Sequence, residues 1–123
     1  MISTNFNTYT NILETKFTEF VTLKEVVDYI RVTKNNQEYP RHLTIMTDAK
    51  FAIFDFSIHD VETIISENEQ SLEKYDSITD AIVVVDPKNT AISILYKDFA
   101  KNPKYNFNVF STTHSAEAWL LNN

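Results

Sequence analysis

The chain has 123 residues and a formal net charge of −6, and it contains neither glycine nor cysteine. This length fits one hydrophobic core, so we expect a single domain over residues 1–123. The negative charge, with Arg31 and Arg41 as the only arginines, argues against binding to nucleic acid.

The missing residue types exclude several kinds of site. Without glycine the chain cannot build a phosphate-binding loop of the P-loop or dinucleotide type, and without cysteine it has no disulfide or thiolate ligand. The histidines, His42, His59 and His114, follow no metal-binding spacing, so we expect neither a metal nor a cofactor. No stretch approaches the roughly 20 apolar residues of a membrane span, and the first ten residues lack a signal-peptide pattern. The expected location is the cytoplasm, and the expected protein is not transmembrane.

The N-terminal third predicts strands followed by a helix. Segments 6–9 and 12–21 are rich in β-prone residues, which predicts an opening hairpin or two strands with Phe17 and Phe20 buried. Thr22 and Glu25 then have the spacing of a capping box, and apolar residues at 23, 26, 27 and 30 form one helical face. With glycine absent, asparagine and aspartate are expected at left-handed turn positions.

Two apolar runs follow, at 42–47 and 51–56. The first predicts a strand, and the second either extends that strand or lies over the core as an extended segment. Alternation along the second run leaves two orientations for Phe54. Outward, it would line a groove or a dimer surface, and inward, the simpler placement, it would pack beneath the second or third helix.

The clearest strand is 81–85, whose apolar residues do not alternate with polar ones, as in a parallel strand covered on both faces. A second helix is predicted from Ser57 to about residue 75, and a third from Asp86, with Pro87 at its first position, to about residue 102. A final strand at 105–111 precedes a last helix from Thr112. The order predicts an α/β fold with a mixed, largely parallel central sheet of four to five strands and about four helices.

Over most of residues 12–121 the chain resembles the SpoIIAA-like branch of the STAS domain superfamily. The resemblance lies in the capping box at 22–25, the strands at 81–85 and 107–110, and the closing segment 116–120. It implies a non-enzymatic regulatory or protein-interaction module. The superfamily shares its fold in outline with CRAL-TRIO lipid carriers, which implies, as an alternative, a small carrier of a nonpolar, lipid-like ligand.

The resemblance also points to Ser57 as a phospho-switch, because anti-sigma-factor antagonists of this superfamily carry a phosphorylatable serine at the comparable helix start. The neighbouring serine and glycine of that loop are absent around Ser57, and a helix cap explains the residue more simply. Asp48 and Asp86 follow predicted strands, at the edge where open α/β sheets bind ligands. These aspartates either hold a cation there, or have local roles in which Asp48 caps a turn and Asp86 caps a helix.

No catalytic residue is expected, and we expect no enzyme. Ser57, His59 and Asp60 include the residue types of a triad, but neighbours on one helical turn cannot aim at one another as the chemistry requires. Phe51, Phe54 and Phe56 are the candidates for a ligand or interface surface. The expected partner is a protein, a second copy of the chain through the exposed hairpin edge or an outward Phe54, or a small nonpolar molecule.

Overall fold

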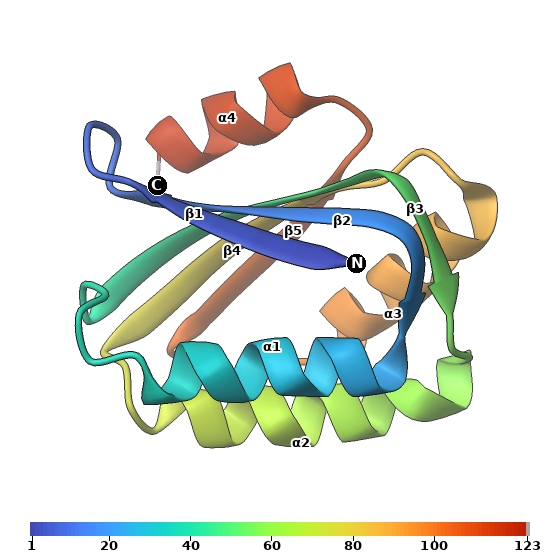
Figure 1. Cartoon of the computed structure of the whole chain (residues 1–123), viewed down its shortest axis with the longest axis horizontal. Coiled ribbons are helices and arrows are strands. Elements are labelled where there is room, and N and C mark those ends of the chain that lie inside the picture. Colours follow the sequence, from blue (N-terminus) through green and yellow to red (C-terminus); the bar gives the residue numbers. More distant parts are fainter. Residues whose placement is uncertain (123) are drawn as a thin grey trace.

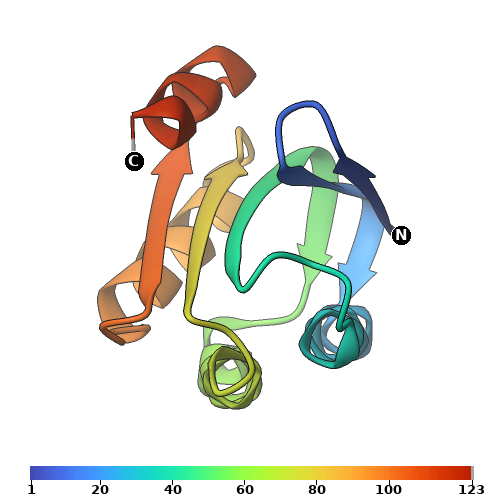
Figure 2. The same ribbon diagram turned by 90° about the vertical axis from the view of Figure 1, so that its left-hand side faces the viewer.

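The computed structural model describes residues 1–122 as one sheet with helices on both faces (Figures 1 and 2). The sheet order follows the chain: β1 (Ile2–Asn7), β2 (Ile12–Thr22), β3 (His42–Asp55), β4 (Ser77–Val83) and β5 (Tyr105–Phe110). β1 pairs antiparallel with β2 as a hairpin, one of the two arrangements predicted, although β1 covers Ile2–Asn7 and not residues 6–9. The other neighbouring strands are parallel. The predicted mixed, largely parallel sheet is confirmed.

Three helices cover one face of the sheet and the fourth covers the other. The first three are α1 (Leu23–Asn35), α2 (Val61–Leu72) and α3 (Pro87–Phe99), and α4 (Thr113–Leu121) lies opposite them (Figure 2). A single 3-10 turn, η1 (Ile58–Asp60), precedes α2. Because each of the first three joins neighbouring parallel strands, crossovers of one hand place them on the same face.

Three helices, α1, α3 and α4, begin where the sequence predicts caps, whereas α2 begins at Val61, after the 3-10 turn that Ser57 caps. Thr22 Oγ1 accepts a hydrogen bond from Glu25 N at 3.2 Å, and Asp86 Oδ2 accepts one from Asn89 N at 3.0 Å. The Thr112 side chain caps α4 in the same way. Each cap pairs a backbone amide that the helix itself leaves free.

β3 carries one residue more than the strand beside it. After Lys16 pairs with Asp48, β2 advances by two residues while β3 advances by three. This bulge inverts the alternation, so that Ala49 and Phe54 both face α1–α3, with Phe54 only 3% exposed, while Phe51 faces outward and is 69% exposed. An outward Phe54 is therefore wrong, because the bulge turns that side chain into the core.

Two further predictions are corrected near the bulge. Phe20 is 64% exposed rather than buried, and the residue before it, Glu19, has a left-handed backbone with φ of 60°. The expected asparagine takes the other left-handed position, Asn11 in the β1–β2 turn. Asp48 does not end a strand, because β3 continues to Asp55 after its pairing with β4 stops.

The main core lies between the sheet and α1–α3, and a smaller one lies beneath α4. In β4, Ile82 contributes to the main core while Ala81 and Val83 contact α4, so this strand is covered on both faces as predicted. β4 nevertheless begins at Ser77, four residues earlier than predicted. None of the helices within residues 1–122 has the length and apolar character needed to cross a membrane.

Candidate functional site

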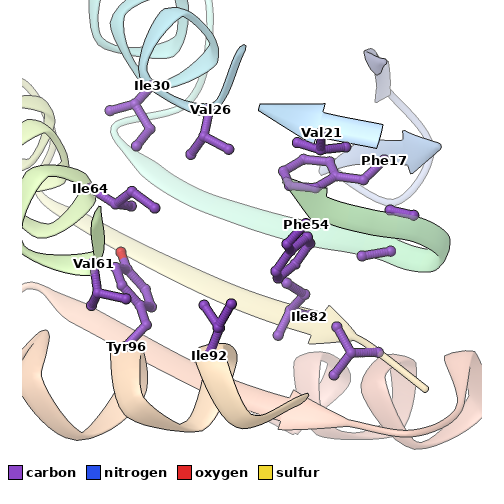
Figure 3. Packing of buried hydrophobic residues seen from close by; sticks show 13 residues of the cluster. Phe17, Val21, Val26, Ile30, Phe54, Val61, Ile64, Ile82, Ile92 and Tyr96 are labelled. Carbon is purple, nitrogen blue, oxygen red and sulfur yellow. The ribbon is translucent and has the colours of Figure 1, made fainter. Parts of the chain in front are cut away.

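A chamber of about 100 Å³ lies between the sheet and α1–α3. Most of its wall is aliphatic or aromatic. Figure 3 shows the buried side chains of this region, with Ile30, Ile64 and Ile92 reaching in from one helix each toward Phe54 and Ile82 of the sheet. The chamber is therefore lined largely by residues of the main core.

One carboxyl group, that of Asp80, faces this apolar chamber. Asp80 lies in the middle of β4, and Ile78 and Ile82, two residues away on either side, face the same way. Thr47 Oγ1 donates a hydrogen bond to Asp80 Oδ1 at 3.0 Å, and within residues 1–122 no group pairs with Oδ2. The side chain keeps some accessible surface because it lines the chamber.

Burial raises the pKa of Asp80 to about 7, because the charged form loses its hydration, and the Thr47 hydrogen bond acts in the opposite direction. An ordinary aspartate has a pKa of about 3.9 and is fully ionised at neutral pH. Asp80 is therefore divided between its neutral and charged forms near neutrality.

Three tyrosine hydroxyls lie around the same space. Tyr29 Oη is 3.0 Å from Thr15 Oγ1, and Tyr96 Oη donates to Tyr105 Oη at 3.0 Å. Burial raises the pKa of all three tyrosines, and the nearby Asp80 charge raises it further. At neutral pH these hydroxyls stay protonated, so they act as hydrogen-bonding groups and not as bases.

The hydroxyl of Ser93, on α3, also lines the chamber. Ser93 is 3% exposed, and its Oγ is buried without a hydrogen-bond partner among residues 1–122. Buried hydroxyls are nearly always paired with protein or water, because an unpaired one loses its hydration without compensation. Together with Asp80 Oδ2, it is a polar atom beside the chamber without a hydrogen-bond partner among residues 1–122.

Asn89 holds the β3 wall of the chamber in place. Since β4 ends at Val83, the last residues of β3 have no strand beside them on this side. The fully buried Asn89 side chain takes that place: Oδ1 accepts from Phe54 N at 3.0 Å, and Nδ2 donates to Ala52 O at 2.8 Å. One amide thus replaces a strand partner and fixes Phe54.

Of the residues proposed from sequence, the structure brings only Phe54 and Phe56 together in the chamber. Their rings stack with centroids 5.0 Å apart. Phe51 lies on the outer face, and Ser57 is exposed at the start of η1, where its Oγ accepts from His59 N at 3.2 Å.

The two aspartates proposed from sequence have other partners. Asp48 Oδ2 forms an ion pair with Lys50 Nζ at 3.1 Å, and Asp86 caps α3. Within residues 1–122 no group of three or more acidic or histidine side chains is arranged to hold a metal ion. Asp86 has the helix-capping role weighed against a ligand role, whereas Asp48 lies within β3 and pairs with Lys50.

Sequence reasoning missed Asp80 because it began the strand at residue 81. Had the strand been extended back to Ser77, alternation would have placed Asp80 between Ile78 and Ile82 on one buried face. An aspartate between two buried isoleucines is the signal that was available. Ser93 carried no such signal, because its missing partner is a property of the three-dimensional packing.

No protein-family model matches the chain, and no curated protein is similar enough in sequence to count as a relative. Among solved structures the chain is similar to an uncharacterised protein of the DUF3478 family from Shewanella loihica PV-4, described as having a SpoIIAA-like fold. The TM-score is 0.62 at 14% identity, over 97% of this chain and 93% of that one. The chain therefore has a SpoIIAA-like fold, as the sequence resemblance implied.

Proposed function

We propose that this chain is a non-enzymatic binding module that holds a small, mostly apolar molecule in the chamber. The observation that supports this is the pair of unpartnered polar atoms, Asp80 Oδ2 and Ser93 Oγ, beside a mostly apolar space. A ligand that supplies their missing hydrogen bonds while filling the apolar volume would stabilise both.

The volume limits the size of the ligand. An apolar cavity of roughly 150 Å³ accepts benzene, so a chamber of about 100 Å³ suits a molecule of about four to six non-hydrogen atoms. An acyl chain of a membrane lipid is much longer. The volume does not favour the lipid-like carrier considered from the sequence.

Binding accounts for the chamber better than catalysis does. Asp80 is the only residue among its described walls that titrates near neutrality, and the tyrosines keep their protons. Catalysis that needs both a titrating acid and a titrating base is not supported, because Asp80 has no second group of this kind among the described lining residues. The chamber offers hydrogen bonds and apolar contact, which are the requirements of a binding site.

A filling variant tests this proposal. We expect n-butanol to shift the methyl resonances of Ile82 and Ile92, on the chamber wall, in an NMR titration of the wild type. Ser93→Leu should abolish these shifts by occupying the space, and Ala91→Leu, at an exposed position of the same helix, should leave them unchanged. Equal shifts in wild type and Ser93→Leu would contradict binding in the chamber.

A protein partner is the second candidate function, and a surface groove between α2 and α3 supports it. The groove has a volume of about 710 Å³, and its lining includes the apolar Leu95 and Phe99 and the acidic Glu62 and Glu69. Apolar and acidic side chains together are complementary to a basic amphipathic helix. Ser57 directly precedes η1, whose Ile58 and His59 line the groove, so phosphorylation there would add negative charge close to it.

A basic amphipathic peptide tests the groove. Phe99→Asp should abolish binding measured by fluorescence anisotropy, and Phe20→Asp, an equally exposed phenylalanine on β2, should not. Ser57→Glu should strengthen binding through the added charge, whereas Ser57→Ala should not change it. Equal binding by Phe99→Asp and Phe20→Asp would reject this groove as the docking site.

A further inference from the structure

The described wall of the chamber carries an acidic side chain but no basic one. Among the described residues that line it, Asp80 is the only acidic side chain, and there is no lysine, arginine or histidine. The titratable groups that face Asp80 from the packed elements are Tyr29 of α1, Tyr96 of α3 and Tyr105 of β5, all of which stay neutral. The protein supplies no cation to balance a carboxylate here.

The surroundings of Asp80 suit a cation in two ways. An opposite charge beside a buried carboxylate compensates for its lost hydration, and here that compensation is not supplied by the protein. Aromatic faces attract cations as well, and Phe54, Phe56 and Phe107 are part of the wall. A carboxylate and aromatic rings in the wall of one chamber are a combination that recognises organic ammonium groups.

We propose that the chamber selects a small organic cation, namely a primary amine on a short apolar body. This inference rests on the proposed function and specifies its ligand class. The ammonium group donates to Asp80 Oδ2, and Ser93 Oγ is available as a second acceptor on α3. The apolar body, of about four carbons, fills the remaining volume between the helices and the sheet.

The competing ligand classes fit less well. An anion of the same size would place a second negative charge beside Asp80, which raises the energy of both. An uncharged alcohol can donate one hydrogen bond to Oδ2 but does not balance its charge. The amine should therefore bind more tightly than its isosteres whenever Asp80 is ionised.

Four-carbon probes that differ only in their polar group test this selection. We expect n-butylamine to bind the wild type at pH 8 at least about tenfold more tightly than n-butanol, and butyrate to bind least. The readout is NMR titration of the Ile82 and Ile92 methyl groups, with the exposed Ile58 as an internal control. The preference for the amine should shrink at pH 5, where Asp80 holds a proton and the amine remains charged.

Asp80→Asn provides the matched variant. It should retain n-butanol binding and lower the preference for n-butylamine to less than about threefold, because the amide cannot balance a cation. Asp98→Asn, the same change at an exposed position of α3, should behave as wild type.

The possible failures are distinguishable. If n-butanol equals n-butylamine in the wild type at pH 8, the chamber binds apolar molecules without selecting cations, and the inference is wrong while the proposed function stands. A preference that persists in a folded Asp80→Asn protein also overturns it. If no probe moves the Ile82 and Ile92 methyl groups, the chamber takes no such ligand and both proposals fail.

Discussion

Protonation of the buried Asp80 makes the free energy of unfolding depend on pH. In the unfolded chain an aspartate titrates near about 3.9, whereas folded Asp80 titrates at about 7. Between these values the folded protein holds a proton that the unfolded chain has released. The free energy of unfolding therefore falls as the pH rises from about 4 to about 7.

Asp80→Asn should remove this fall. We expect the wild type to lose roughly 2–4 kcal/mol of stability through Asp80 between pH 4.5 and pH 8, and Asp80→Asn to lose correspondingly less. Urea unfolding at the two pH values measures the difference. Asp98→Asn should retain the wild-type dependence, and an equal dependence in Asp80→Asn would show that Asp80 titrates normally.

Asn89 is a second residue with a large expected contribution to stability, because its side chain makes two buried hydrogen bonds. Asn89→Ala should lower the free energy of unfolding by about 2–4 kcal/mol, since it leaves the buried Phe54 amide and Ala52 carbonyl unpaired. Lys88→Ala is the control: its Nζ donates to Phe54 O at 2.9 Å, but the side chain is exposed and water can replace it. A loss below about 0.5 kcal/mol for Asn89→Ala would contradict the role given to this amide.

At the scale of elements, the capping box fixes where α1 begins. Thr22→Ala should cost about 1 kcal/mol, because the Glu25 amide loses its acceptor at the start of the helix. Thr63→Ala, at an exposed position within α2, should change the stability by less than about 0.5 kcal/mol. Chemical denaturation of both variants measures the difference. Equal losses in the free energy of unfolding would show that the cap does not stabilise the protein.

The elements that local chemistry determines were predictable from the sequence. The caps at Thr22, Asp86 and Thr112 depend on residues within one helical turn of each other, so the sequence places them correctly. The start of β4 depends instead on pairing with β3, more than thirty residues away in the chain. No local pattern indicates the β3 bulge either, which explains why the sequence left two orientations open for Phe54. Phe20 is a different case, because alternation from the buried Phe17 along β2 already places it on the outer face.

The candidate site was predictable only in part, because it too depends on contacts between segments that are far apart in the chain. Phe54 and Phe56 drew attention as an aromatic run, but their joint placement in the chamber follows from the bulge and from Asn89. Asp80 required the correct strand start. Ser93 required the whole packed interior, because a missing hydrogen bond cannot be recognised until every neighbour is in place.

At the scale of the whole molecule, the outer strip, defined as Phe20, Phe51 and Ile53, is a candidate contact between two copies of the chain. The three side chains are 64%, 69% and 47% exposed, and Phe20 lies opposite Ile53 in the β2–β3 pairing. Adjacent exposed apolar residues of this size are typical of interaction surfaces. A symmetric dimer would cover the strip on both copies.

Phe51→Asp tests the dimer. We expect light scattering to give twice the mass of the chain for the wild type and the mass of one chain for Phe51→Asp, because a charge cannot be buried in an apolar contact without a partner. Phe99→Asp, in the α2–α3 groove, should remain dimeric. A wild type that stays monomeric at high concentration would rule out this contact.

The β3 bulge makes the number of residues in this strand matter more than their identity. Removing one residue between Asp48 and Phe51 would take out the extra residue and leave the later β2–β3 pairs, such as Val21 with Phe54, unchanged. Phe54 would stay in the chamber, and Phe51 and Ile53 would stay on the outer face. Removing one residue between Phe51 and Phe54 would instead move Phe54 to the outer face. During evolution, a single-codon deletion is therefore tolerable at the bulge and damaging three residues later.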